Sequence, residues 1–182
     1  MDYKKLLENS NALLQGHFLL TSGLHSDKYI EKMRILENPA LMEPFLEKMK
    51  DLSPRADWFV GPTLGGAIIA FELARLAGRK SAFAERTEKG RALKREFEIK
   101  KSDKIVIADD ILTTGSSIKE TIKAADKGEI VAVVVMIDRS VEDIELGIPV
   151  KSVLKYPIEI FPPEKCPLCK EKRPITRRGG KR

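Results

Sequence analysis

Short apolar runs alternate with helix-forming segments through the middle of this chain, and this alternation limits the fold more than any other feature. The runs that resemble buried strands are residues 58–60, 81–84, 105–108 and 130–137. Helices are predicted between them at residues 65–77 and 116–127, and a glycine follows each one. Strands that alternate with helices favour right-handed crossovers and a mainly parallel sheet with helices on its faces.

The N-terminal part is less regular. Leucines among polar residues predict a helix over residues 2–14, ended by Gly16, and Pro39 opens a second helix that runs to about residue 52. Two short strands are predicted at residues 17–20 and 28–30, around a Ser22-Gly23 turn. Residues 85–94 are polar and basic and are predicted to form a loop.

The composition is that of a folded domain with a basic terminus. Hydrophobic residues make up 42% of the 182 residues, which is enough to bury a core, and the length predicts one domain. The formal net charge is +6, but residues 170–182 hold seven basic residues and one acidic residue, so the rest of the chain is balanced. We therefore expect a solvated, partly disordered tail, and we do not expect nucleic acid as a partner.

The sequence also argues against membrane and secreted classes. No apolar run approaches membrane-spanning length, and residues 1–8 are charged and lack the core of a signal peptide, so we expect a cytoplasmic protein without a membrane partner. The two cysteines, Cys166 and Cys169, have zinc-knuckle spacing, but the chain has no second cysteine pair. We expect a reversible disulfide or two packed thiols rather than zinc, because a four-thiolate site would need two subunits.

Three polar segments fall where strands of the predicted sheet end, which is where parallel sheets bind ligands. They are residues 61–66, 109–117 and 138–139. In the second segment, Asp109 and Asp110 follow a strand, and Thr-Thr-Gly-Ser-Ser leads into the next helix. Two carboxylates can hold ribose hydroxyls or Mg²⁺, and a turn with hydroxyls, free N–H groups and a glycine can cradle a phosphate. Together they predict a sugar-phosphate site.

A plainer interpretation of the same residues is a pair of loop charges followed by a helix cap. A lone Asp-Asp pair would favour that interpretation. We favour the binding site because four apolar residues, two acids, two further apolar residues and Thr-Thr-Gly-Ser-Ser follow one another without a break. The segment is not a nucleotide P-loop, since it contains no Gly-Lys-Ser/Thr.

Residues 105–117 resemble the phosphoribosyl pyrophosphate (PRPP) motif of type I phosphoribosyltransferases. The resemblance extends over most of the chain to the orotate phosphoribosyltransferase family. Residues 16–29 resemble its N-terminal hood, residues 61–66 its pyrophosphate loop, and residues 83–86 and 137–140 two further segments, while Cys-Pro-Leu-Cys resembles the tail of some members.

The resemblance implies the type I phosphoribosyltransferase fold, an α/β fold with a mainly parallel central sheet flanked by helices and a small N-terminal hood. It also implies a single domain over residues 1–182. The hood would lie mainly in residues 1–35, the core in about 36–165, and the Cys-x-x-Cys motif with the basic tail in 166–182.

The resemblance further implies a reaction of pyrimidine (UMP) biosynthesis, in which orotate and PRPP give orotidine 5′-phosphate and pyrophosphate. Displacement at the anomeric carbon needs positioning and charge stabilisation rather than a protein nucleophile, and Mg²⁺ on the diphosphate improves the leaving group. The implied PRPP-binding residues are Arg86, Lys89, Asp109, Asp110, Ile111, Leu112, Thr113, Thr114, Gly115, Ser116 and Ser117. The implied catalytic residues are Asp109, Asp110, Arg86 and Lys89, and no residue is assigned as a direct ligand of Mg²⁺.

Orotate would be bound by Thr113 and Arg139, because a guanidinium suits its carboxylate. A surface ion pair with Asp138 is the alternative for Arg139. The basic loop with Arg86, Lys89, Arg91, Lys94 and Arg95 would be a mobile lid over the pyrophosphate, and in the family such a loop often reaches the neighbouring site of a homodimer. An ordinary solvated loop is the alternative, and Lys94 and Arg95 could instead begin a return strand.

The chain departs from better-known members at several positions. Gly65 and Thr21 stand where those members have lysines, and the lid contains no histidine. Gly65-Gly66 indicates either a pyrophosphate site built from backbone or a glycine-assisted helix start, and His25 is either a compensating donor or a hydrogen-bonded turn residue. Two other functions stay open: a phosphoribosyltransferase for another base, against which the hood and Arg139 argue, and a PRPP-sensing regulator without catalytic activity.

Overall fold

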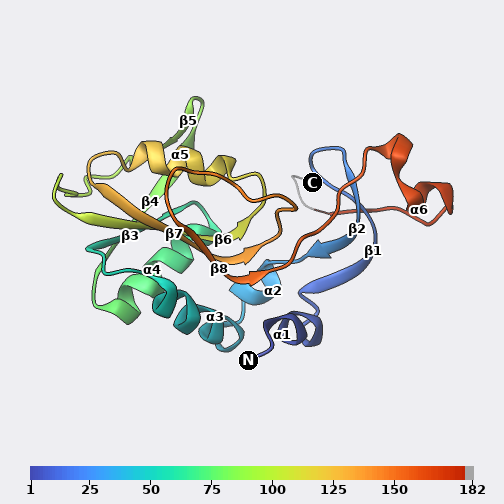
Figure 1. Ribbon diagram of the computed structural model, residues 1–182, viewed down its shortest axis with the longest axis horizontal. Coiled ribbons are helices and arrows are strands. Elements are labelled where there is room, and N and C mark those ends of the chain that lie inside the picture. Colours follow the sequence, from blue (N-terminus) through green and yellow to red (C-terminus); the bar gives the residue numbers. More distant parts are fainter. Residues whose placement is uncertain (179–182) are drawn as a thin grey trace.

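The structure, a computed structural model, describes residues 1–178 and contains two sheets (Figure 1). The larger sheet has six strands, which are in spatial order β5 (Gly90–Ala92), β4 (Lys80–Thr87), β3 (Trp58–Pro62), β6 (Lys104–Leu112), β7 (Glu129–Asp138) and β8 (Val150–Lys155). All neighbouring strands are parallel except β4 and β5, which form an antiparallel hairpin. This confirms the predicted mainly parallel sheet.

Helices cover both faces of this sheet (Figure 1). The helices α3 (Pro39–Leu52) and α4 (Gly65–Ala77) pack on one face, and α5 (Ser116–Ala124) packs on the other. Strand β6 shows why its sequence is apolar without a break: Val106 and Ala108 belong to the core under α3 and α4, whereas Ile105 and Ile107 belong to the core under α5. A strand buried on both faces needs apolar side chains at every position.

The smaller sheet forms the hood at one end of the molecule, on the right in Figure 1. Its strands are, in spatial order, β2 (His25–Ile30), β1 (Leu13–Leu19) and β9 (Thr176–Arg177). The short helices near it are α1 (Tyr3–Asn9), α2 (Met33–Leu36), the 3-10 helix η1 (Pro163–Lys165) and α6 (Pro167–Lys170). Strand β1 pairs antiparallel with β2 and parallel with β9, so both ends of the chain contribute to the hood.

Three predictions of secondary structure are wrong. The first helix ends at Asn9, because Asn11 adopts a φ of 54° and the chain then enters β1, which takes Leu13 and Leu14. Residues 85–94 are not a plain loop, since β4 and β5 extend into them as a hairpin; Lys94 and Arg95 follow β5 and do not begin a strand.

The described part of the predicted tail, residues 170–178, is exposed to solvent as expected, but its residues 176–177 form β9, and the segment just before the tail is packed. Cys166 and Leu168 are buried, and β9 hydrogen-bonds to β1, so this segment has both apolar contacts and backbone partners. The last part of the predicted tail, residues 179–182, lies outside the described residues. Among the helices of residues 1–178, none has the length and apolar character needed to cross a membrane.

Candidate active site

Two adjacent carboxylates lie at the carboxyl end of the central strand β6. Asp109 and Asp110 are 6% and 3% exposed, because β6 continues past them to Leu112 instead of ending at Ala108 as predicted. Each carboxylate accepts a hydrogen bond from the next backbone N–H: Asp110 N donates to Asp109 Oδ1 over 2.8 Å, and Ile111 N donates to Asp110 Oδ1 over 2.7 Å. The backbone therefore fixes the direction of both carboxylates.

Lys32, which the sequence did not single out, contacts this acidic pair. Its Nζ lies 2.8 Å from Asp110 Oδ2, and the side chain enters from the segment after β2. Burial, the largest single influence, would lower the pKa of Lys32, but the attraction and hydrogen bond of Asp110, together with the charge of Asp109, outweigh it, so the pKa is raised and the ammonium stays charged. A lysine in a polar stretch gives no signal in the sequence, because the contact depends on how the hood meets the sheet.

The pKa of Asp109 is also raised, but in a carboxyl this favours the neutral form. Its burial, together with repulsion from the neighbouring charge of Asp110, raises the pKa of Asp109 to about 7. At neutral pH this carboxyl is therefore close to its midpoint and can exchange a proton, which suits a group that holds sugar hydroxyls.

The predicted pyrophosphate loop packs directly on the acidic pair. A Cβ at Gly65 would overlap Asp110 Oδ2, a Cβ at Gly66 would lie 2.8 Å from Asp109 Oδ1, and a Cβ at Gly61 would overlap the Gly66 carbonyl. Glycine is thus required for this close approach, which supports the backbone-built interpretation of Gly65-Gly66. These glycines also begin α4, whose N-cap Leu64 gives no side-chain cap, so the first N–H groups are available to an anion.

The Thr-Thr-Gly-Ser-Ser turn forms a second anion site at the start of α5. Gly115 adopts a φ of 73°, which favours glycine, and it caps α5 without a side-chain hydrogen bond. Thr113, Thr114 and Ser116 are exposed, and Thr114 Oγ1 donates to Ser116 Oγ over 3.3 Å. Free N–H groups, hydroxyls and the positive end of the helix dipole converge here, as a phosphate requires.

Two cavities meet at this edge of the sheet. The smaller, about 290 Å³, is lined by both carboxylates, Lys32, the glycine loop, Ile111 and Ser117. The larger, about 730 Å³, lies between the hood and the loop after β7, with walls that include Leu20, Leu24, Ile158 and Ile160. The cavities share three residues, Tyr29, Thr113 and Arg139. A charged compartment therefore adjoins a larger, mostly apolar one.

Arg139 stands at the junction of the two cavities. Its backbone N–H donates to the Leu112 carbonyl over 3.0 Å, which anchors the loop after β7 beside β6. Its side chain has no hydrogen bond or ion pair within residues 1–178, and burial lowers the pKa of its guanidinium. The alternative of an ion pair with Asp138 is wrong, because Asp138 accepts hydrogen bonds from Ser140 and lies 2.8 Å from Lys155 Nζ. A partly buried, unpaired guanidinium is suited to receive an anion.

The basic hairpin places a different arginine in the site from those predicted. Arg91, whose side chain is 5% exposed, lines the smaller cavity and donates from Nη1 to the carbonyls of Thr63 and Ala84. Arg86 and Lys89 are exposed and line neither cavity of this chain. Leu112 is buried in the core and lines neither of these cavities. The arginine in the wall, Arg91, was not distinguishable in a run of basic residues.

His25 lines neither of the two cavities, so it is not the compensating donor that the sequence allowed. Its Nδ1 lies 3.0 Å from His17 Nε2 and 3.3 Å from Cys169 Sγ.

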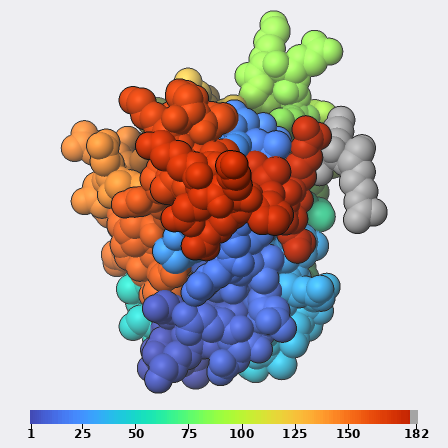
Figure 2. All heavy atoms as spheres, turned by 90° about the vertical axis from the view of Figure 1, so that its right-hand side faces the viewer, coloured from blue at the N-terminus to red at the C-terminus, as the bar shows by residue number. Residues whose placement is uncertain are grey.

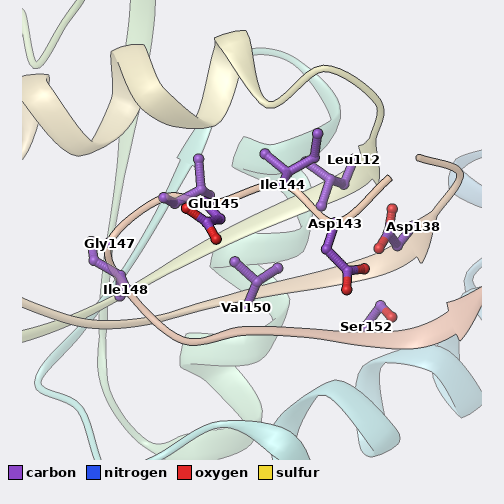
Figure 3. Close-up of a pocket in the computed structure, with 10 residues that line it drawn as sticks. Leu112, Asp138, Asp143, Ile144, Glu145, Gly147, Ile148, Val150 and Ser152 are labelled. Carbon is purple, nitrogen blue, oxygen red and sulfur yellow. The ribbon is translucent and has the colours of Figure 1, made fainter. Parts of the chain in front are cut away.

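A third cavity of about 450 Å³ is lined largely by the loop between β7 and β8 (Figure 3). Asp138, Asp143 and Glu145 are among its lining residues, and none of the lining residues is basic. It is therefore unsuited to phosphate or carboxylate ligands.

Comparison with family profiles gives no match, but the chain is clearly similar in sequence to individual proteins. The chain is 40% identical over 186 residues to orotate phosphoribosyltransferase of Caldicellulosiruptor bescii, covering 99% of this chain and 97% of the relative. It is 38% identical over 188 residues to the protein of the same name from Carboxydothermus hydrogenoformans, covering 100% and 98%. The crystal structure of orotate phosphoribosyltransferase from Aeropyrum pernix is similar with a TM-score of 0.73 and 25% identity, covering 83% of this chain and 92% of that one.

Proposed function

This chain belongs to the orotate phosphoribosyltransferase family, and from that premise we propose that it transfers 5-phosphoribose from PRPP to orotate, giving orotidine 5′-phosphate and pyrophosphate. The observation that supports this most is Arg139. It offers a partly buried guanidinium, without a partner among residues 1–178, between an apolar cavity, which suits a flat base, and a charged cavity, which suits a phosphorylated sugar. Orotate differs from other pyrimidines in the carboxylate that such a group would bind.

In this proposal PRPP spans the smaller cavity and the turn before α5. The 5′-phosphate binds the N–H groups and hydroxyls of residues 113–117, and the ribose hydroxyls bind Asp109 and Asp110. The orotate nitrogen then attacks the anomeric carbon while the bond to the pyrophosphate oxygen breaks. The two carboxylates would stabilise the positive charge that develops on the sugar ring, and no protein nucleophile is required.

The pyrophosphate would lie against the start of α4, where Gly65 and Gly66 expose backbone N–H groups. Lys32 and Arg91 line the same cavity and supply positive charge. Position 65 has no room for a lysine, because a Cβ there would overlap Asp110 Oδ2. Lys32 instead brings an ammonium to this carboxylate from the segment after β2. Arg86 and Lys89 remain candidates for a lid.

The acidic pair suits Mg²⁺, a hard cation that prefers carboxylate and phosphate oxygens. Lys32 already faces one oxygen of Asp110, so Asp109 and the oxygens of PRPP are the groups that would hold the ion, directly or through water. When bound to the diphosphate, Mg²⁺ makes it a better leaving group. We also propose that the chain works as one domain and as a homodimer in the cytoplasm, with Arg86 and Lys89 of the exposed hairpin reaching the neighbouring site.

The assignment is tested with purified protein, PRPP and Mg²⁺, offered orotate, uracil, adenine or hypoxanthine in separate reactions. Release of pyrophosphate with orotate, and at most a trace with the other bases, is the expected result. Consumption of another base in place of orotate would refute the proposal. Tight PRPP binding without turnover of any base would point instead to a regulator.

A further inference from the structure

Four potential metal ligands converge on the outer side of the hood, away from both substrate cavities. His17 belongs to β1 and His25 to β2, whereas Cys166 and Cys169 come from the segment of η1 and α6 near the other end of the chain. Figure 2 shows this C-terminal segment, in red, lying across the blue N-terminal hood. The sequence contains two histidines and two cysteines, and all four belong to this one cluster.

The distances within the cluster match a tetrahedral site. His17 Nε2 lies 3.0 Å from His25 Nδ1, 3.5 Å from Cys166 Sγ and 3.7 Å from Cys169 Sγ, and Cys169 Sγ lies 3.3 Å from His25 Nδ1. All four ligand atoms lie within 4.8 Å of one another. Tetrahedral bonds of about 2.0–2.1 Å to nitrogen and 2.3 Å to sulfur would place ligand atoms roughly 3.3–3.8 Å apart.

The tautomer of His17 also fits a ligand. Its Nδ1 lies 2.9 Å from the Arg173 carbonyl, which can only accept, so Nδ1 carries the hydrogen. The neutral ring then points the lone pair of Nε2 at His25 and both sulfurs. Metal-binding histidines are commonly oriented in this way, by a backbone carbonyl on the far ring nitrogen.

We propose that His17, His25, Cys166 and Cys169 bind one zinc ion in a closed Cys₂His₂ site. Two thiolates and two imidazoles are the donor set that favours zinc, and four protein ligands leave no position open for a substrate, so the ion is structural. The proposal does not depend on the proposed reaction, because the cluster lines neither substrate cavity. The proposal differs from the expectation of a disulfide or two packed thiols, because two histidines of the same chain would supply the second ligand pair in place of cysteines from another subunit.

The site would fasten the C-terminal segment to the hood. That segment also pairs with β1 through β9, and its neighbour Phe161 exchanges two backbone hydrogen bonds of 2.8 Å with His25. Residues from both partners, among them Leu24, Ile160 and Arg178, line the larger cavity. Since the hood sheet has only three short strands, a metal cross-link would supply stability that its small core lacks.

The test begins with the full-length protein, purified anaerobically without chelator and analysed for metal by mass spectrometry. We expect zinc at one equivalent per chain. Cys169→Ser, which changes an exposed side chain and should leave the fold intact, should lose most of this zinc. Lys165→Ala, an exposed neighbour outside the ligand set, should retain it. Cobalt replacing zinc should give the intense visible bands of tetrahedral Co²⁺ together with thiolate charge-transfer absorption.

A strong chelator should lower the Tm of the wild-type protein by on the order of 10 °C and leave that of Cys169→Ser unchanged. Three results would overturn the proposal. They are a wild-type protein that takes up no zinc after anaerobic reconstitution, a Cys169→Ser protein that keeps its zinc, and a Cys166–Cys169 disulfide in the freshly isolated protein.

Discussion

Replacement of Arg139 by alanine separates binding of the base from binding of the sugar phosphate. The guanidinium has no partner within residues 1–178 and is partly removed from water, so a substrate carboxylate would gain a charged pair at a place where no protein contact must first be broken. Hydrogen bonds between charged groups contribute about 1.5–3 kcal/mol. The loss should therefore raise KM for orotate roughly 10- to 150-fold, while binding of PRPP changes little.

The same substitution makes an independent prediction about stability. Since burial of an unpaired charge is unfavourable, Arg139→Ala should leave the Tm unchanged or raise it. Initial rates at varied orotate and varied PRPP, calorimetry with PRPP and a thermal melt supply the three measurements. Equal losses for both substrates, or a Tm lowered by several degrees, would show that Arg139 supports the fold and that the argument from its lack of a partner is wrong.

Two control variants sharpen this experiment. Arg139→Lys keeps the charge but loses the forked geometry, so it should recover only part of the orotate affinity. Arg178→Ala removes the other arginine of the same cavity, but Arg178 already lies 3.7 Å from Glu31, so its loss should change KM for orotate by less than about fivefold.

Three further substitutions test the acidic end of the site. Asp109→Asn, melted without substrate or Mg²⁺, should raise the Tm at pH 8 but not near pH 3, where the carboxyl is protonated in both the folded and the unfolded state. Between the ordinary pKa of 3.8 and the folded pKa of about 7, the unfolded state ionises while the folded state keeps its proton, so the cost to stability grows over this range and is complete above pH 7, at up to about 4 kcal/mol. An equal gain at both pH values would contradict this. Lys32→Met should raise KM for PRPP about tenfold in steady-state assays and raise KM for orotate by less. A larger rise in KM for orotate would show that Lys32 does not bind the pyrophosphate. Gly65→Ala should lower the free energy of unfolding by about 1–3 kcal/mol in denaturant titrations and raise KM for PRPP, because its Cβ would overlap Asp110. Wild-type stability and KM would mean that the loop can move aside.

The central sheet could be predicted from the sequence because its strands are local, continuous apolar runs. The helices at residues 39–52 and 65–77 were predicted with their observed ends, since Asn38 caps the first and Gly78 terminates the second in a left-handed conformation. Strand β8 was missed because its side chains are mostly half-buried or exposed and give no long apolar signal.

The candidate site was predictable where its residues follow one another, as in the Asp-Asp–Thr-Thr-Gly segment, and unpredictable where distant segments meet. Lys32 reaches Asp110 across 78 positions only because the hood packs on the sheet. Arg91 faces inward because the basic segment forms a hairpin that the sequence alone did not indicate. The pairing of histidines with cysteines across the chain has the same origin, since no local pattern relates His17 to Cys166.

The pairing of β1 with β9 has a consequence for how the protein is made. Phe18 and Leu19 pair with Thr176 and Arg177, which follow them by 158 positions and are synthesised correspondingly later. Strands β3, β6 and β7 lie between these segments and can pair earlier, so the half of the molecule that holds Asp109 and Asp110 is expected to form first. The compartment for the base is lined by Arg178 as well as by hood residues, so it is complete only after this later segment has joined β1.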